Sequence, residues 1–186
     1  MDVAFLFDSS ENAKDLLFEK QKSFVINFST RLAKMEVSGW TIKVRMAALQ
    51  YSSSVTIEHG FSTWQDLDEF HRSVISMIYI GHGTYSTYAI TNATQLFARE
   101  TPEDCVRAAV LMTDGADHPR NPDGVRAAEE AKGRGVLLFA VGLSDLAHQS
   151  QNSVKLRALA SEPTQRFVHS LTDPQLENKL LTEMVS

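Results

Sequence analysis

Two apolar runs, each closed by an aspartate, constrain the fold of this chain more than any other feature of its sequence. Residues 3–7 are all apolar and precede Asp8, and residues 108–112 are followed by Thr113 and Asp114. Five consecutive apolar residues suit a central strand that is covered on both faces. Because parallel strands end at the same edge of a sheet, both aspartates are expected at the carboxyl edge, where open α/β sheets bind ligands.

Predicted strands and predicted helices alternate along the whole chain. The expected strands cover residues 3–7, 41–51, 55–58, 107–113, 136–142 and 166–169. Helical spacing of apolar residues fills the segments between them, including a long helix at about 12–34, and Asp173-Pro174 predicts the N-cap and first residue of the last helix. This order predicts an α/β fold: a doubly wound, Rossmann-like sandwich with a mainly parallel central sheet, one antiparallel edge strand and helices on both faces.

Length and composition set further bounds. The 186 residues suit a single domain, 1–186, and Met1 stands directly before the first strand, so we expect a domain cut from a longer chain. The net charge of −5 and the scattered basic residues argue against nucleic acid as a partner. No apolar run approaches the ~20 residues of a membrane span, so membrane insertion is not expected. A single cysteine, Cys105, excludes an internal disulfide framework, and the sequons at Asn27 and Asn92 fall inside predicted helices.

Small oxygen-bearing side chains gather at three of the predicted strand ends. Asp8, Ser10 and Asn12 follow the first strand, Thr84 lies in a glycine-rich loop before a helix, and Asp114 follows a later strand. A magnesium-type site needs six oxygens, few of them from carboxylates. Each aspartate alone is explained as well by helix capping or loop solvation, but two of them beside hydroxyl-rich loops favour a metal site.

These residues, in this order, resemble the von Willebrand factor type A domain. The metal-ion-dependent adhesion site of that family has the pattern D-x-S-x-S, a distant threonine and T-D-G. Here the corresponding residues are Asp8, Ser10 and Asn12, then Thr84, then residues 113–115. Segments 135–142 and 156–163 also match, and the chain is most similar to the A domains of matrix collagens of the collagen VI or XXVIII type.

The resemblance implies a non-catalytic, secreted domain of the extracellular matrix that binds proteins through Mg²⁺ or Mn²⁺. Ser10 and Thr84 would be direct hydroxyl ligands, and Asp8 and Asp114 would contact the metal partly through water. Asn12 replaces the family's last serine, where its carbonyl oxygen can ligate a hard cation or its side chain can cap the first helix. The implied partners are matrix proteins such as collagens, or adhesion receptors, and the parent chain would be trimeric through a collagen region.

Four residues next to the predicted site form a candidate ligand-binding rim: Glu11, Tyr85, Asp117 and His118. Loop solvation is the simpler explanation of Asp117 and His118, ring packing over the loop also explains Tyr85, and Glu11 suits an N-terminal cap. Trp40 and Trp64 are predicted to be packing residues rather than binding residues.

Three other functions remain open. The chain can be an intracellular type A scaffold domain, or a structural matrix module whose metal site has degenerated at Asn12. It can also be a metal-dependent phosphotransferase with Asp8 as the nucleophile, but such enzymes carry a second acid where Ser10 stands. The sequence lacks G-x-S-x-G and the phosphate-binding loop, so hydrolase and nucleotide-phosphate chemistry have no support.

Overall fold

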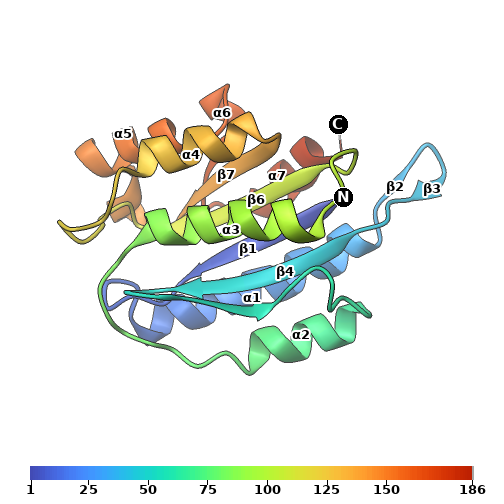
Figure 1. The fold of residues 1–186 in the computed structure, drawn as a ribbon, viewed down its shortest axis with the longest axis horizontal. Helices are drawn as coiled ribbons and strands as arrows, with labels where there is room; N and C mark the ends of the chain where they lie inside the picture. The colour runs from blue at the N-terminus through green and yellow to red at the C-terminus, as the bar shows by residue number, and fades with distance from the viewer. Residues whose placement is uncertain (186) are drawn as a thin grey trace.

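The computed structural model describes residues 1–185 and contains a central six-stranded sheet (Figure 1). The strand order is β5-β4-β1-β6-β7-β8. All neighbouring strands are parallel except β4 and β5, which pair antiparallel at one edge. The strands are β1 (Asp2–Asp8), β4 (Arg45–Tyr51), β5 (Val55–His59), β6 (Arg107–Thr113), β7 (Val136–Gly142) and β8 (Val168–Ser170). The predicted fold class is therefore confirmed.

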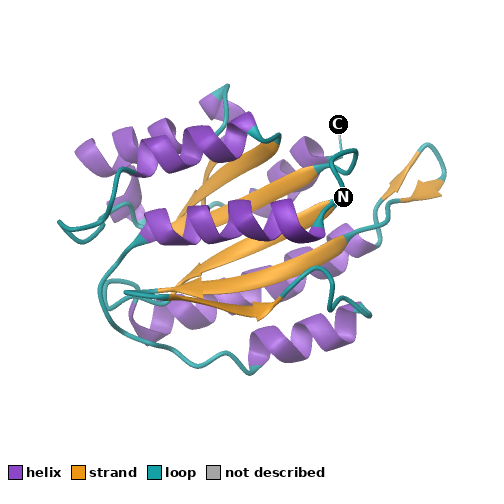
Figure 2. Cartoon of the chain, viewed as in Figure 1, coloured by secondary structure: helices purple, strands orange, loops and turns teal. Residues whose placement is uncertain are grey.

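Helices cover both faces of this sheet (Figure 2), and the strands divide their side chains between two cores. In β1, Val3, Phe5 and Phe7 join one core, whereas Ala4 and Leu6 join the other. The first core also contains residues of α1 (Lys14–Ala33), α2 (Leu67–Ile75) and α7 (Leu176–Met184). The second contains residues of α3 (Ser86–Glu100), α4 (Gly124–Gly133) and α5 (Ser150–Leu159). This two-sided burial explains why β1 is apolar at consecutive positions.

Short elements complete the chain: η1 (Asp145–His148), α6 (Thr164–Phe167) and a separate hairpin formed by β2 (Glu36–Val37) and β3 (Trp40–Thr41). Within residues 1–185, none of the helices combines the length and the apolar character needed to cross a membrane.

The predicted strand at 41–51 is wrong at its beginning. Ser38 and Gly39 have φ angles of 53° and 83°, which makes them the two central residues of a tight hairpin turn between β2 and β3. The backbone then crosses to the sheet, and β4 starts at Arg45, opposite Asp2 of β1. Trp40 is 80% exposed in this hairpin, so its predicted role as a packing residue is also wrong.

The last helix begins later than predicted. The Asp173 carboxylate accepts a hydrogen bond from the N–H of Gln175, and the carbonyl oxygen of Asp173 accepts one from Leu176, so residues 173–176 form a turn before α7. Asp173 also pairs with the ammonium group of Lys179. The aspartate and proline therefore lead into the helix but are not its N-cap and first residue.

Candidate metal centre

The loops that follow β1 and precede α3 are joined by backbone hydrogen bonds at the carboxyl edge of the sheet. The N–H of Gly81 donates to the carbonyl of Ser9 at 2.8 Å, and the N–H of Glu11 donates to the carbonyl of His82 at 2.7 Å. A parallel bridge links Ser10 to His82. These bonds bring the Asp8–Asn12 loop, which the sequence separates from Thr84 by more than seventy residues, against the loop that carries that threonine.

Asp8 is fixed at the end of β1 by both its backbone and its side chain. The amide of Gln21 in α1 accepts from the Asp8 N–H at 2.7 Å and donates to the Asp8 carbonyl at 2.9 Å. The carboxylate accepts from the N–H of Ser10 at 2.9 Å. Burial raises the pKa of Asp8 from 3.8 to about 6; the contacts with Ser10 oppose this rise, and the charge of Asp114 adds to it. The site therefore holds a carboxylate whose charge is poorly compensated by the protein.

Ser10 places a hydroxyl beside that carboxylate. Its side chain is fully buried, and within residues 1–185 its Oγ has no partner in hydrogen-bonding geometry. The backbone of Ser10 is held separately, because the Tyr79 hydroxyl donates to the Ser10 carbonyl at 2.9 Å. An orphaned buried hydroxyl costs stability and calls for an explanation, and ligation of a cation is one.

Thr84 lies at the end of a loop held by Ser52. The Ser52 hydroxyl donates to the carbonyl of Gly83 at 3.0 Å and accepts from the N–H of His82 at 2.9 Å. Thr84 itself is 3% exposed, and its carbonyl accepts from the N–H of His118 at 2.7 Å. This last bond attaches the Thr84 loop to the loop that follows Asp114.

Asp114 stands directly after β6 and is 5% exposed. Ser144, in the loop after β7, binds both of its oxygens: its N–H donates to Oδ1 at 2.8 Å and its hydroxyl donates to Oδ2 at 3.1 Å. Gly115 follows with a φ of +84°, a conformation that favours glycine. The turn thus aims the carboxylate while β6 and β7 fix its position.

Asn12 links three of these loops. Its Nδ2 lies 3.3 Å from the hydroxyl oxygen of Thr84 and 3.4 Å from the carbonyl oxygen of Ala116. The amide therefore directs its hydrogens, rather than its oxygen, towards the threonine. In this orientation Asn12 ties the loops together but does not offer a ligand oxygen at Thr84.

The four candidate rim residues fall into different environments. Glu11 is exposed, and the Tyr85 ring stacks on the His118 ring with centroids 5.0 Å apart. The Tyr85 hydroxyl and the Nδ1 of His118 are hydrogen-bonded at 3.0 Å. The Asp117 carboxylate accepts from the N–H and the hydroxyl of Ser86, at 2.9 and 2.8 Å, and pairs with Lys155. Asp117 thus serves as an anchor for the start of α3, whereas the other three are accessible around the site.

Sequence reasoning missed the residues that hold the site in place: Gln21, Ser52, Tyr51 and Ser144. One of them had a visible signal, because Gln21 falls on the same helical stripe as Phe18, Val25 and Phe28, where a polar residue is out of place. Tyr51, the last residue of β4, is fully buried, and its hydroxyl donates to the carbonyl of Met112 in β6 at 2.7 Å. Ser144 carries no local signal, since its role depends on the pairing of β6 with β7.

The donor set fits a hard divalent cation. Two buried carboxylates and two buried hydroxyls meet at one edge, and oxygen ligands of this kind suit Mg²⁺ or Mn²⁺. Within residues 1–185 the site brings together only two acidic side chains, so hydroxyl oxygens would have to supply the other protein ligands. The orphaned Ser10 hydroxyl and the raised pKa of Asp8 are the two observations that a cation would resolve.

The parallel sheet, with two aspartates and hydroxyl loops at its carboxyl edge, defines a doubly wound α/β domain with a candidate metal site. The chain belongs to the von Willebrand factor type A domain family, whose model matches residues 2–183.

Among sequence relatives, human matrilin-3 is 29% identical over 175 residues, which cover 90% of this chain and 33% of matrilin-3. The chicken collagen alpha-2(VI) chain is 29% identical over 171 residues, which cover 89% of this chain and 16% of the collagen chain. The likeness to collagen VI that the motifs indicated is therefore confirmed. The chain spans about a third of matrilin-3 and about a sixth of the collagen chain.

Among solved structures, proximal thread matrix protein 1 from the mussel byssus superposes with a TM-score of 0.73 and 18% identity. The match covers 99% of this chain and 46% of that chain. Another structure of the same mussel protein is described as having a zinc-occupied metal-ion-dependent adhesion site motif. At this level of identity the similarity shows the shared fold.

Proposed function

We propose that this chain is a non-catalytic interaction domain of the extracellular matrix that binds protein partners through a divalent cation, Mg²⁺ or Mn²⁺. Asp8, Ser10, Thr84 and Asp114 would hold the cation at the carboxyl edge of the sheet. The observation that carries the proposal is the buried Ser10 hydroxyl, which lies beside the Asp8 carboxylate but has no partner in good hydrogen-bonding geometry within residues 1–185.

The balance of charge explains how such a site would bind a partner. Two carboxylates that act partly through water and two neutral hydroxyls would leave the cation incompletely neutralised and short of its six oxygen ligands, so it could take an anion as a further ligand. When bound, the cation would supply that attraction, and an acidic side chain of the partner is the natural ligand. Tyr85, His118 and Glu11 surround the site at accessible positions, where they would contact the residues next to that acid.

The location and the partners are proposed from the relatives. Collagen and matrilin chains match nearly the whole domain, and the structurally similar mussel protein is called a thread matrix protein. Secretion into the extracellular matrix, with matrix proteins or adhesion receptors as partners, follows as the simplest common role.

Catalysis is not part of the proposal. A phosphotransferase with Asp8 as the nucleophile needs a general acid two residues later, and Ser10 occupies that position. The Asp8 carboxylate is 1% exposed and accepts a bond from the Ser10 N–H, which makes it a poor nucleophile for a bulky phosphate ester. Metal-dependent hydrolysis of p-nitrophenyl phosphate that disappears in Asp8→Asn would contradict this part of the proposal.

The first test is thermal unfolding of the wild type and of Asp114→Asn, in Mg²⁺, in Mn²⁺ and in EDTA. A metal that binds only the folded chain adds about 2.7 kcal/mol at roughly 100 times its dissociation constant. We expect a rise in the midpoint that Asp114→Asn abolishes and that Glu129→Ala, an exposed acid of α4, retains. Asparagine keeps the size of Asp114 and an acceptor for the Ser144 N–H, so the variant isolates the charge.

The second test measures binding to a panel of immobilised matrix proteins in Mg²⁺ and in EDTA. The proposal expects binding that EDTA and Asp114→Asn remove together.

One structural observation favours a second function, a structural module with a degenerate site: Asn12 directs its amide hydrogens to the Thr84 hydroxyl oxygen. Absence of any metal-dependent shift in the melts would select that alternative.

A further inference from the structure

The β2–β3 hairpin projects away from the body of the protein (Figure 1). Trp40 is 80% exposed, and Val37, its partner across the hairpin, is 40% exposed. Residues directly opposite in an antiparallel pair lie on the same side, so the two form one apolar knob. The two-residue turn at Ser38 and Gly39 fixes the shape of this knob before any partner arrives.

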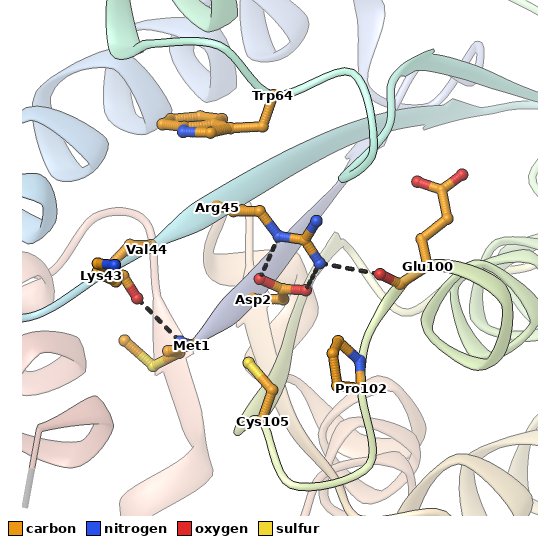
Figure 3. A pocket seen from close by; sticks show the side chains of 9 residues that line it. All are labelled: Met1, Asp2, Lys43, Val44, Arg45, Trp64, Glu100, Pro102 and Cys105. Atoms are coloured by element: carbon orange, nitrogen blue, oxygen red, sulfur yellow. Dashed lines mark hydrogen bonds and ion pairs between the residues drawn. The ribbon is translucent and has the colours of Figure 1, made fainter.

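A pocket of about 480 Å³ opens at the same end of the molecule, opposite the candidate metal centre. Its lining is mainly apolar, with the Arg45–Asp2 ion pair at the back. Figure 3 shows Trp64 on one side of the ion pair, and Pro102 and Cys105 on the other. A pocket of this size is ample for an indole ring. Lys43 and Val44, which connect the hairpin to β4, also line it.

We infer that the knob of one copy of this chain enters the pocket of a second copy, and the second knob enters the first pocket. Knob and pocket are neighbours on one chain, which is the arrangement that a two-fold symmetric, self-complementary interface requires. Trp40 is exposed on its own chain and so leaves its own pocket open. A second copy offers the matching knob, and the charges around the two surfaces and the buried area favour it as the occupant.

The charges around the two surfaces are complementary. Exposed Lys34 precedes the hairpin and exposed Lys43 lies between the hairpin and the pocket that it also lines, whereas exposed Glu103 and Asp104 lie in the loop that forms the Pro102–Cys105 wall of the pocket. Glu36, within the hairpin, is acidic and partly offsets the positive charge of the two lysines. Two-fold pairing places the lysines of each copy towards the acids of the other, so the association weakens as salt rises.

The surface area that the two copies would bury indicates a weak, reversible dimer. A buried tryptophan removes about 150–250 Å² from solvent. Two of them and the pocket walls that they cover approach about 1,000 Å² in total, the lower limit for a specific interface. Tryptophan is also the residue type most enriched among those that dominate binding energy.

Sedimentation equilibrium over a micromolar to near-millimolar concentration series tests the inference. The wild type should show a monomer–dimer equilibrium that is unchanged by EDTA and by Asp114→Asn, because the interface lies at the other edge from the metal centre. Trp40→Ala should weaken the dimer by about tenfold or more. Ile78→Ala, at a residue that is also 80% exposed but lies between α2 and α3, should not. A monomer at every concentration, or a dimer that Trp40→Ala leaves intact, overturns the inference.

Cross-linking then identifies the contact, since Cys105 is the only cysteine and lines the pocket. Val37→Cys keeps Trp40 and places a thiol beside it, so mild oxidation should yield a dimer linked from position 37 of one copy to Cys105 of the other. The double variant Val37→Cys/Cys105→Ser should lose this product, and Ile78→Cys should not form it. A linked dimer that persists in the double variant means contact between two hairpins and overturns the proposed pairing.

Discussion

The N–H of Ser144 lies 2.8 Å from Oδ1 of Asp114, and the Ser144 hydroxyl lies 3.1 Å from Oδ2. One residue after β7 therefore orients both oxygens of the carboxylate that follows β6. Groups that orient a metal ligand in this way commonly affect metal affinity by 10–100-fold when they are removed. Ser144 connects the sheet to the proposed site, although it lies outside both the Asp8–Asn12 motif and the motif at residues 113–115.

Ser144→Ala should weaken Mg²⁺ binding by about tenfold, because the Asp114 carboxylate keeps the N–H bond but loses the hydroxyl bond that fixes its rotation. Titration of Mg²⁺ followed by the unfolding midpoint measures the change. Ser53→Ala, at an exposed turn position, is the matched control and should bind Mg²⁺ as the wild type does. Equal affinity in wild type and Ser144→Ala would show that the N–H alone holds the carboxylate.

Stability in EDTA should fall as the pH rises through the range in which Asp8 ionises. Burial raises the pKa of folded Asp8 to about 6 from an ordinary value of 3.8. The folded chain thus keeps this proton to a higher pH than the unfolded chain, so the contribution is fully present below pH 3.8 and lost by about pH 6. The difference corresponds to roughly 3 kcal/mol.

Asp8→Asn removes the ionisation but keeps an oxygen that accepts the Ser10 N–H. In EDTA at pH 7.5 we expect this variant to unfold at a higher urea concentration than the wild type, and to lose that advantage at pH 4. Asp15→Asn, at an exposed position in the first turn of α1, should show no such crossover. Parallel pH profiles for Asp8→Asn and the wild type would exclude a raised pKa at Asp8.

Gly115→Ala should destabilise the chain. The backbone there has a φ of +84°, and a Cβ would lie 3.0 Å from the Cβ of Asn152 and 3.2 Å from its carbonyl oxygen. The conformation alone costs an L-residue about 1–2 kcal/mol, and the displaced α5 backbone adds to this. Gly133→Ala, at the end of α4 with no atom within 4 Å of its Cβ, should instead be neutral or stabilising by up to about 1 kcal/mol. Urea unfolding of the pair compares them, and equal midpoints would contradict the strain at Gly115.

The sheet and the position of the site follow from local patterns in the sequence. The apolar runs of β1, β6 and β7 are buried on both faces, and a run of this kind has few other structures available to it. Asp8 and Asp114 come next in the chain, and parallel pairing of β1 with β6 then brings them to one edge. The places of the two aspartates were thus predictable because they depend on strand ends alone.

The features that the sequence did not predict depend on contacts between distant segments. The Ser38–Gly39 pair suits a helix end as well as a hairpin turn, and only the pairing of Glu36 with Thr41 distinguishes the two. The start of α7 shifts because the Asp173 carboxylate binds Lys179 and the N–H of Gln175. The exposure of Trp40 likewise follows from the hairpin, because tryptophan as a residue type is usually largely buried.

Asn12→Ser should strengthen Mg²⁺ binding several-fold. The Nδ2 of Asn12 lies 3.3 Å from the Thr84 hydroxyl oxygen and 3.4 Å from the Ala116 carbonyl oxygen, so its hydrogens occupy a lone pair that a cation needs. To offer its oxygen, the amide must rotate and give up both contacts, which are weak at these distances. Serine lacks the amide hydrogens, restores D-x-S-x-S, and supplies a smaller oxygen ligand.

Mg²⁺ titration monitored by the unfolding midpoint compares wild type, Asn12→Ser and Asn12→Ala. The alanine variant separates two effects: equal gains in both variants mean that removing the amide is enough, and a gain in serine alone means that the hydroxyl ligates. Weaker binding in both variants would instead show that Asn12 turns its carbonyl oxygen to the metal and is already a ligand.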